Sequence, residues 1–542
     1  MRGIRTSLIA SIAAFAVIAA ACTGGEGTGA TNAGGGGGDG GDPTSTEPDT
    51  FTYSVNSEVM IGWDPASGYS NEVIALHNIY ETLTRYDAAT QEVEPVLAET
   101  WEASEDGLTW TFTLREGVTF HTGNPLTAEA AKAAIERTME LGQAASYIWA
   151  AVEEIETPDE RTLVFRLSYP SPLDLVASGT YSAYIYDTEA ARDQDLAEWS
   201  AEGNDAGTGP YTVAEYSPGD EIELRLEAYP DYWGGWEGDH YEHYVFRVTP
   251  EANTAAQLLR AGDVTMVQRL SPQLYASFEG QEGFHTSSAP SWQTLLGLLN
   301  TASGPLADER VRDAVALAID YEGIIAALEG AGEPLSGVVP PGLWGHTEGL
   351  EYARDVAEAT AMLEDAGYGP NGDPMTLELT YLKGDADEEL VATLIKSNLA
   401  ELNIDVQAQG LQWQTQWDKA KSGDEGERQD VLVFYWWPDY PDPVSWFYSL
   451  FRTEEEPFFN LAYYSNPDLD AMIDEASVVA ATDRDEAANM YAQMQEIVVE
   501  DAPAIPLYTQ VYQRVMQDEV QGFEDNPAYP NVVFGYELTP AA

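Results

Sequence analysis

The chain has 542 residues, a length typical of two large lobes or of about three to four domain-sized units. Its 24 Lys and Arg residues face 92 Asp and Glu residues, for a formal net charge of −68, and this excludes nucleic acid as a partner because phosphate binding needs clustered cations. Hydrophobic residues make up 44% and aromatic residues 11% of the chain, which predicts a folded body, while the single cysteine excludes a disulfide framework and a cysteine-based zinc site.

The N-terminal segment has the pattern of a secretory signal. Arg2 and Arg5 precede a short apolar run that ends at Cys22, and the run is too short to remain as a membrane span. Bacterial lipoprotein signals are cut and lipidated at such a cysteine, although they prefer Leu where this chain has Ala19. We predict a signal peptide over residues 1–21 and a lipid on Cys22. The alternative is a plain secretory signal with a chance cysteine.

Residues 22–50 are predicted to be a flexible tether. They are rich in Gly, Thr and Asp and have no apolar periodicity. A Gly-rich coil of this length spans about 30 Å, which keeps a folded body near a membrane without fixing its orientation. No later segment has 18 consecutive apolar residues, so we expect lipid to be the only anchor.

From residue 51 onward, strand and helix patterns alternate to the end of the chain. Strands are predicted at 51–59, 110–115, 162–167, 212–216, 221–227, 293–300, 375–382, 404–410, 430–436 and 504–508. Helices are predicted at 71–87 (ending in a turn), 128–141, 252–263, 308–330, 356–368, 386–402 and 484–502. This mixture, with short Gly, Pro and Asp turns, indicates an α/β or α+β class.

Several motifs in this body resemble a known family. They are NIYETLTRYD (78–87), the long segment from PVLAETW to AAIER (95–137), GTGPY (207–211), LNTASGPLADERVRDAVALAID (299–320), ATAMLEDAGY (359–368) and EIVVEDAPAIPLY (496–508). Together they resemble the family 5 extracellular solute-binding proteins, the peptide- and nickel-type receptors of ABC importers. The resemblance covers essentially the whole chain from residue 51.

The resemblance implies an α/β, two-lobe fold of the periplasmic-binding-protein type (type II, large cluster C), with an extra subdomain in lobe one. The lobes would be joined by two crossover strands and close on a ligand like a flytrap. Lobe one is expected at 51–299, with the subdomain inserted at about 85–210. Lobe two is expected at 300–504, and residues 505–542 would return to lobe one.

The most informative stretch for ligand binding is 434–451, which combines many aromatic residues with three prolines. The prolines predict an irregular loop, and aromatic residues on a loop are a recognition signal. In peptide-binding members of the family, an Asp three residues after a Trp pairs with the ligand α-ammonium group. Trp436 and Asp439 keep this spacing, and a carboxylate accepts well from an ammonium in a dry cleft.

Neighbouring side chains on this stretch are also candidates for ligand contacts. Trp437 and Tyr440 flank Asp439 in the predicted loop. Asp442 is a weaker candidate, because an Asp before Pro often starts a turn.

Three further tryptophans are candidates. Trp413 and Trp417 are four residues apart and share one face if the segment is helical; the tryptophan that matches Trp413 in peptide-binding relatives lines the cleft. Trp292 lies just before the expected crossover strand. The alternative for the first two is that both pack under the lobe surface.

One position departs from the pattern of the dipeptide-specific members. They carry an arginine that grips the ligand carboxylate, and this chain has Lys383 in that region and no arginine. Lys is a point charge and is less suited to a bidentate site. The departure favours longer peptides, or ligands without a carboxylate end.

Catalytic and metal-binding patterns are weak. No nucleophile-elbow, zinc-protease or nucleotide-binding motif is present. His240 and His243 would suit a metal only on a helix, and their segment has the pattern of a strand entry. We therefore predict a protein that is not an enzyme and has neither a metal site nor a cofactor.

The prediction is a monomeric substrate-binding lipoprotein on the outer face of the cytoplasmic membrane. It would capture di- or oligopeptides and deliver them to the permease subunits of an ABC importer. Two alternatives stay open: the same fold binding an oligosaccharide or other small solute, and a membrane-tethered ligand sensor. The acidic surface suggests a high-salt habitat, or only the acidic bias of a secreted protein.

Overall fold

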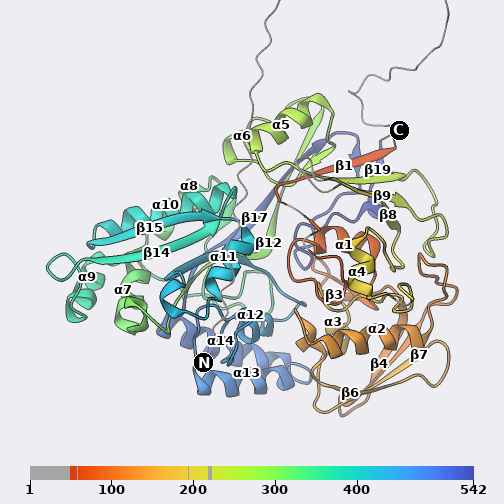
Figure 1. Cartoon of the computed structure of the whole chain (residues 1–542), viewed down its shortest axis with the longest axis horizontal. Helices are drawn as coiled ribbons and strands as arrows, with labels where there is room; N and C mark the ends of the chain where they lie inside the picture. The colour runs from red at the N-terminus through yellow and green to blue at the C-terminus, as the bar shows by residue number, and fades with distance from the viewer. Residues whose placement is uncertain (1–48, 58, 61, 193, 218–222, 542) are drawn as a thin grey trace, which may run out of the picture. The chain divides into compact units, whose positions relative to one another are not determined.

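The computed structural model describes residues 49–57, 59, 60, 62–192, 194–217 and 223–541, which belong to one compact unit. The predicted signal peptide and nearly all of the predicted tether lie outside the described residues. The helices, labelled as in Figure 1, are α1 (Val73–Ile79), α2 (Ala128–Leu141), α3 (Leu173–Val176), α4 (Leu196–Ala201), α5 (Ala252–Ala261), α6 (Pro272–Ala276), α7 (Glu309–Ala318), α8 (Tyr321–Ala327), α9 (Val356–Asp365), α10 (Ala386–Ala400), α11 (Trp413–Ala420), α12 (Val444–Leu450), α13 (Pro467–Val479) and α14 (Arg484–Asp501). The strands are β1 (Thr50–Val55), β2 (Thr84–Asp87), β3 (Glu92–Pro95), β4 (Ala98–Ala103), β5 (Thr109–Leu114), β6 (Val152–Glu156), β7 (Thr162–Leu167), β8 (Tyr211–Ser217), β9 (Glu223–Ala228), β10 (His243–Val248), β11 (Met266–Val267), β12 (Phe284–Leu299), β13 (Gly332–Glu333), β14 (Met375–Leu382), β15 (Ile404–Leu411), β16 (Val431–Trp436), β17 (Ala504–Gln517), β18 (Val520–Gln521) and β19 (Thr539–Pro540).

One large mixed sheet runs through the described part of the chain. Its strand order is β15-β14-β16-β12-β17-β11-β1-β10-β9-β8, and β13 pairs with β17 beside this path. β14 is parallel to β15 and β16, and β1 is parallel to β10 and β11. In Figure 1, β14 and β15 lie on one side of the long pair β12 and β17, and β1, β8 and β9 lie on the other.

The central strands β12 and β17 are long because each belongs to both sides of the sheet. They pair antiparallel, and the pairing is interrupted between Pro290 and Thr294. Before the interruption β17 pairs with β11, and after it β12 pairs with β16. Residues 294–299, which have β16 on one side and β17 on the other, are all buried, as expected for a central strand. An interruption of this kind is a place where two halves of a sheet can turn relative to each other.

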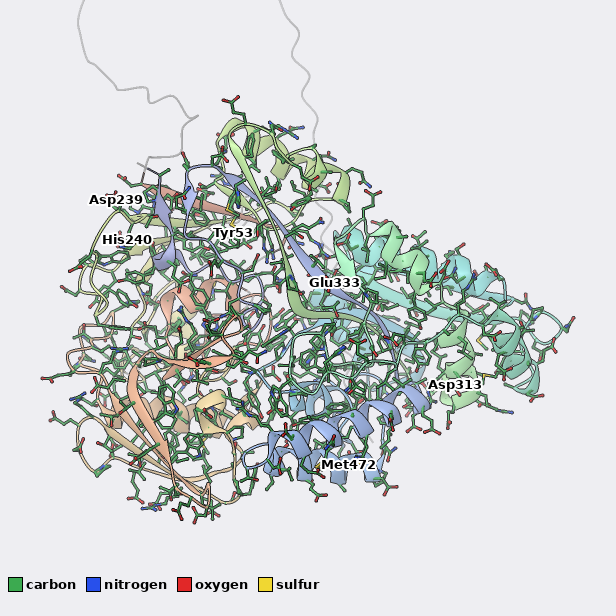
Figure 2. All side chains as sticks on the ribbon, turned by 180° about the vertical axis from the view of Figure 1, so that it is seen from behind. Tyr53, Asp239, His240, Asp313, Glu333 and Met472 are labelled. Carbon is green, nitrogen blue, oxygen red and sulfur yellow. The ribbon has the colours of Figure 1, made fainter. Side chains whose placement is uncertain are left out.

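Strand β1 shows why the N-terminal side has a continuous core. All six of its residues are buried, since it pairs with β10 on one side and β11 on the other. Tyr53 lies inside this core (Figure 2), and its hydroxyl donates to the carbonyl of Asn531 at 3.3 Å. Burial raises the pKa of Tyr53 to about 12, so the phenol stays neutral.

A separate four-stranded antiparallel sheet, in the order β4-β5-β7-β6, lies within the predicted insertion. Its core contains Phe112 and Phe165, whose ring centroids are 5.5 Å apart, and Trp149 stacks on Phe165 at 6.0 Å. The adjoining helix α2 begins where the Thr127 side chain accepts from the N–H of Ala130, and ends at Gly142 with φ of 58°. These caps explain why the pattern AEAAKAAIERTMEL forms one complete helix.

The helix predicted at 308–330 is wrong in one respect, because the segment forms two helices. α7 ends at Ala318 and α8 begins at Tyr321. Asp320 between them accepts from the N–H of Gly323 and so caps the second helix. The apolar periodicity continues across the break, which is why the pattern alone favours one helix. No described helix is long and apolar enough to span a membrane.

Acidic residues cluster on the surface, and this predicts a salt effect on stability. Glu99, Glu102, Glu105 and Asp106 are all exposed in or near β4, in a chain of net charge −68. Raising NaCl from about 0.01 M to about 1 M shortens the Debye length from roughly 30 Å to roughly 3 Å and screens their repulsion. We expect the melting temperature to rise markedly across this range in calorimetric scans, with a neutral osmolyte as control. A flat or falling series would contradict the electrostatic explanation.

Candidate functional site

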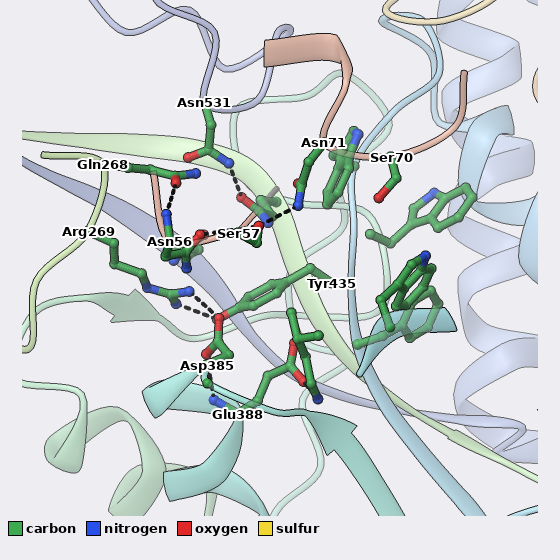
Figure 3. A pocket seen from close by; sticks show the side chains of 18 of the residues that line it. Asn56, Ser57, Ser70, Asn71, Gln268, Arg269, Asp385, Glu388, Tyr435 and Asn531 are labelled. Carbon is green, nitrogen blue, oxygen red and sulfur yellow. Dashed lines mark hydrogen bonds and ion pairs between the residues drawn. The ribbon is translucent and has the colours of Figure 1, made fainter. Parts of the chain in front are cut away.

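A cavity of about 500 Å³ lies beside the interruption between β12 and β17. Its wall is built from segments that are far apart in the sequence (Figure 3). The wall includes Asn56, Ser57, Tyr69, Ser70, Asn71, Tyr181, Gln268, Arg269, Gln293, Lys383, Asp385, Glu388, Trp413, Gln416, Trp436, Trp437, Asp439, Gln510, Arg514 and Asn531.

One part of the wall comes from the segment 434–451, where the predicted strand over 430–436 is confirmed but the predicted loop extends too far toward its C-terminal end. Strand β16 continues through Trp436, which pairs with Thr294 of β12, and helix α12 begins at Val444. Only residues 437–443 form an irregular turn. The three prolines fall inside it or at its end, and Pro443 is the N-cap residue of α12, where a missing N–H costs nothing.

Asp439 is the carboxylate on this turn that lines the cavity. It is only 4% exposed, and its Oδ2 accepts from the hydroxyls of Tyr147 at 2.7 Å, Ser445 at 3.1 Å and Ser449 at 3.3 Å. Burial raises the pKa of Asp439 to about 6, although these hydroxyl groups lower it in part. Within the described residues no cation pairs with it. A cation that enters the cavity would therefore meet a carboxylate that it helps to ionise.

Three tryptophans predicted to contact ligand line the same cavity. Trp436 continues β16, and Trp437 donates from its indole N–H to the hydroxyl of Tyr181 at 2.8 Å. Trp413 begins helix α11 and lies half-buried in the wall. Together with Asp439, these side chains give the cavity a large aromatic surface next to one buried acid.

Four other predicted ligand residues do not line the cavity: Trp417, Tyr440, Asp442 and Trp292. Trp417 packs among Tyr69, Phe458 and Phe459, and so it forms the layer behind Trp413. Trp292 packs against Tyr86 with ring centroids 6.0 Å apart. Tyr440 is buried in the core.

Asp442 has the turn role that competes with a ligand role. Its Oδ1 accepts from the N–H of Val444 at 2.9 Å and from the hydroxyl of Tyr491 at 2.8 Å. Burial raises the pKa of Asp442 to about 6, as it does for Asp439. The two carboxyl groups thus lie on the same turn, are both buried and have similarly raised pKa values, but only Asp439 lines the cavity.

A second part of the wall consists of uncharged amides, which the sequence patterns do not single out. The Asn71 amide donates to Ser57 Oγ at 2.7 Å, and Gln268 Oε1 accepts from the N–H of Asn56 at 3.0 Å. Asn531 adds a third amide, 3.5 Å from Gln293 (Figure 3). Amides donate and accept together, which suits a ligand with alternating N–H and C=O groups.

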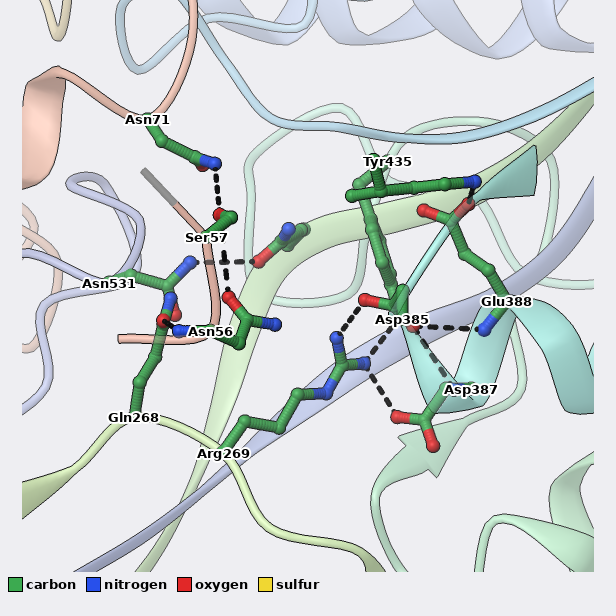
Figure 4. A network of polar contacts seen from close by, with 12 residues as sticks. Asn56, Ser57, Asn71, Gln268, Arg269, Asp385, Asp387, Glu388, Tyr435 and Asn531 are labelled. Carbon is green, nitrogen blue, oxygen red and sulfur yellow. Dashed lines mark hydrogen bonds and ion pairs between the residues drawn. The ribbon is translucent and has the colours of Figure 1, made fainter. Parts of the chain in front are cut away.

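A third part is an ionic network centred on Arg269 (Figure 4). Its guanidinium pairs with Asp385 at 2.6 Å and Asp387 at 2.5 Å, and donates to the Tyr435 hydroxyl at 2.5 Å. Burial lowers the pKa of Arg269, but the two aspartates raise it more, so it remains charged. Sequence patterns miss this group because an acidic run before a helix is usual at N-termini, and its partner lies over 100 residues away.

Lys383 is exposed at the cavity rim and pairs with no acid among the described residues. The two arginines of the wall are both held by the protein. Arg269 is bound as above, and Arg514 donates to Asp525, to the carbonyl of Gln268 and to Asn531. Lys383 is therefore the cation of the described wall that a ligand anion would find without displacing a protein carboxylate.

His240 and His243 lie at the entry to a strand and not on a helix. His240 lies outside the strand beside Asp239 (Figure 2), where its Nε2 is 2.9 Å from the carbonyl of Glu237, and His243 begins β10. Among the described residues, no group of three or more metal-ligating side chains is close enough to hold an ion.

Comparison with known proteins gives a consistent result. Residues 92–457 match the sequence profile of bacterial extracellular solute-binding proteins, family 5 middle. The chain is 28% identical over 472 residues to the probable D,D-dipeptide-binding periplasmic protein DdpA of Escherichia coli, covering 85% of this chain and 89% of that protein.

Solved structures share the fold. The periplasmic binding protein DppA of Helicobacter pylori, in complex with the peptide STSA, superposes with a TM-score of 0.80 at 24% identity, covering 91% of this chain and 98% of that one. NikZ of Campylobacter jejuni, in complex with Ni(L-His), gives a TM-score of 0.81 at 19% identity, covering 91% of this chain and all of that one. The predicted two-lobe periplasmic-binding-protein fold is thereby confirmed.

Proposed function

Because the chain belongs to the bacterial extracellular solute-binding proteins of family 5, we propose that it captures di- or oligopeptides in the cavity and delivers them to the permease of an ABC importer. The family binds solutes outside the cytoplasm and is not catalytic, so the prediction of a non-enzyme is confirmed. DdpA and DppA, with which the chain shares sequence or fold, are named for dipeptide binding or solved with a peptide, and this supports a peptide ligand.

The observation that carries the proposal is the buried carboxylate of Asp439 in an aromatic wall, which forms an ion pair with no cation of the described residues. A peptide brings an α-ammonium group that loses its water on entering and needs an anion. Asp439 supplies that anion, and its three hydroxyl donors hold it in place. The tryptophans would enclose side chains, and the amides of Asn56, Asn71 and Asn531 suit the peptide main chain.

The proposal includes the lobe boundaries predicted from the sequence: lobe one at 51–299 with the insertion at about 85–210, lobe two at 300–504, and a return at 505–542. The long pair β12 and β17, with its interrupted register, supports a crossing near these boundaries. Cavity-lining residues come from both proposed lobes. A hinge of two strands could then close the lobes over a peptide.

We propose lipid attachment at Cys22, which would hold the monomeric receptor at the outer face of the cytoplasmic membrane. Cys22 is the single cysteine of the chain and directly follows the apolar run. A single lipid modification with two or more acyl chains is enough for stable anchoring.

Replacing Cys22 is expected to abolish the anchor. Cys22→Ser should release the protein into the medium or leave its signal uncleaved, because no thiol remains to accept the lipid. Detergent-phase partitioning of wild type and variant measures this directly. Unchanged partitioning of a variant whose signal has been cleaved would contradict lipidation at this residue.

Delivery to a permease is tested in cells. Cells that lack this chain should fail to import a labelled peptide, and re-expression of the wild type should restore import. A membrane-tethered sensor would leave import unchanged in both strains. The remaining alternative, a sugar or other small solute, is tested by binding measurements on the purified protein.

A further inference from the structure

Arg269 connects two segments that are far apart in the sequence (Figure 4). It follows strand β11, and its guanidinium lies against the first turn of α10. Its Nη1 donates to Asp385 at 2.6 Å, and its Nη2 donates to Asp387 at 2.5 Å. By the boundaries proposed above, Arg269 belongs to lobe one and both aspartates belong to lobe two. The two ion pairs therefore form a bridge between the lobes.

The bridge also contacts the interruption in the central strand pair. With its amide oxygen facing Arg269, Gln510 of β17 accepts from Nη2 at 2.5 Å and from Nε at 3.2 Å. The Gln510 amide nitrogen then donates to Gln293 of β12 at 2.8 Å. Residues 291–293 are those at which β12 loses its register with β17. A rotation of the lobes would change the backbone at this interruption, and Arg269 is hydrogen-bonded to Gln510 beside it.

The charges of this group depend on the guanidinium. The side chains of Asp385 and Asp387 are only 3% and 9% exposed, and Arg269 is 21% exposed. A third carboxyl group, Glu388, is buried beside them and accepts from the N–H of Leu382. Without the guanidinium, several acids would face one another with little water. These acids all belong to lobe two, so separation of the lobes would not move them apart, but it would restore their hydration.

We infer that the Arg269–Asp385–Asp387 bridge holds the cavity closed, so that part of the closing free energy is built into the chain and is not supplied by the ligand. A ligand then needs to shift the open–closed equilibrium less far. The inference rests on the two-lobe division proposed above, but it assumes nothing about which solute is bound.

The test measures the distance between the lobes without ligand. The full chain with Cys22→Ser carries no thiol, so dyes can be placed at Glu140→Cys in α2 and Ala361→Cys in α9, both of which are exposed. Single-molecule energy transfer at about 0.15 M salt, where surface charges are screened beyond roughly 8 Å, then gives the closed and open fractions.

Arg269→Gln should lower the closed-to-open ratio by about 30-fold or more, which corresponds to about 2 kcal/mol. Asp387→Asn keeps the pair of Arg269 with Asp385, so it should lower the closed-to-open ratio by a smaller factor. This variant provides the test if Arg269→Gln does not fold. Arg452→Gln, which breaks the exposed pair with Asp474, is the matched control and should leave the ratio unchanged.

Three results would overturn the bridge: a wild type that is entirely open without ligand, an unchanged ratio in both bridge variants, or an equal shift in Arg452→Gln. None of these depends on peptide binding. If the protein does not bind peptides, the distances measured between the dyes without ligand are not affected.

Discussion

Asp439→Asn is expected to weaken binding of a peptide with a free amino terminus by about 30-fold to several thousand-fold. Removing one partner of a buried, hydrogen-bonded charge pair typically costs about 2–5 kcal/mol, and about 1.4 kcal/mol corresponds to a tenfold change in the dissociation constant. Asp439 is buried and held by three hydroxyl groups, so water cannot readily replace it as the partner of an ammonium. Isothermal titration of wild type and variant measures the effect.

Two controls separate a direct pair from a general loss of structure. An N-acetylated copy of the peptide should bind wild type poorly and lose little further in Asp439→Asn, since the charge it lacks is the one that the carboxylate binds. Asp442→Asn alters a carboxyl group on the same turn that does not line the cavity, and it should change peptide affinity far less. If acetylated and free peptides bind wild type equally well, the ligand is not held through its amine.

Arg514→Met is expected to lower the free energy of unfolding by about 3–5 kcal/mol. Arg514 and Asp525 are 2% and 3% exposed and pair at 3.2 Å, and Arg514 also donates to the carbonyl of Gln268. Removing the guanidinium leaves a buried carboxylate without its cation, which is the costly way to break a buried pair. Urea titration followed by tryptophan fluorescence gives the change.

The double variant Arg514→Met/Asp525→Asn should recover part of this loss, because it leaves no buried charge unpaired. The exposed pair of Arg452 and Asp474 provides the surface comparison, and Arg452→Met should cost no more than about 1 kcal/mol. A loss below about 1 kcal/mol for Arg514→Met would mean that the Asp525 carboxylate finds water or a proton easily, and that the pair does not stabilise this side of the fold.

The sequence predicts well the elements whose signals are local. The helix over 386–402 matches α10, because Asp385 caps it and its apolar residues recur at helical spacing. The strands at 375–382 and 404–410 match β14 and β15, because their apolar residues alternate with polar ones as in a strand with one buried face. The sequence does not predict the break at Asp320, because a cap residue inside an unbroken apolar pattern is also compatible with one long helix.

The site was predictable where one segment carries it and not where it is assembled from several. The turn at 437–443 is visible as aromatic residues among prolines, and Asp439 lies on the cavity wall. Spacing alone does not show which tryptophan of a helical pair faces the cavity. In the structure Trp413 lines the cavity and Trp417 packs behind it. The contact of Arg269 with Asp385 depends on the fold itself, so no local pattern points to it.

The central claim is that the cavity binds peptides, and calorimetric titration of the purified chain tests it most directly. A mixed di- and oligopeptide pool and an oligosaccharide pool are titrated separately into the same protein. We predict saturable heat with the peptide pool, lost in Asp439→Asn, and no saturable heat with the oligosaccharides. Saturable binding of the oligosaccharide pool with none of the peptides would contradict the proposed function.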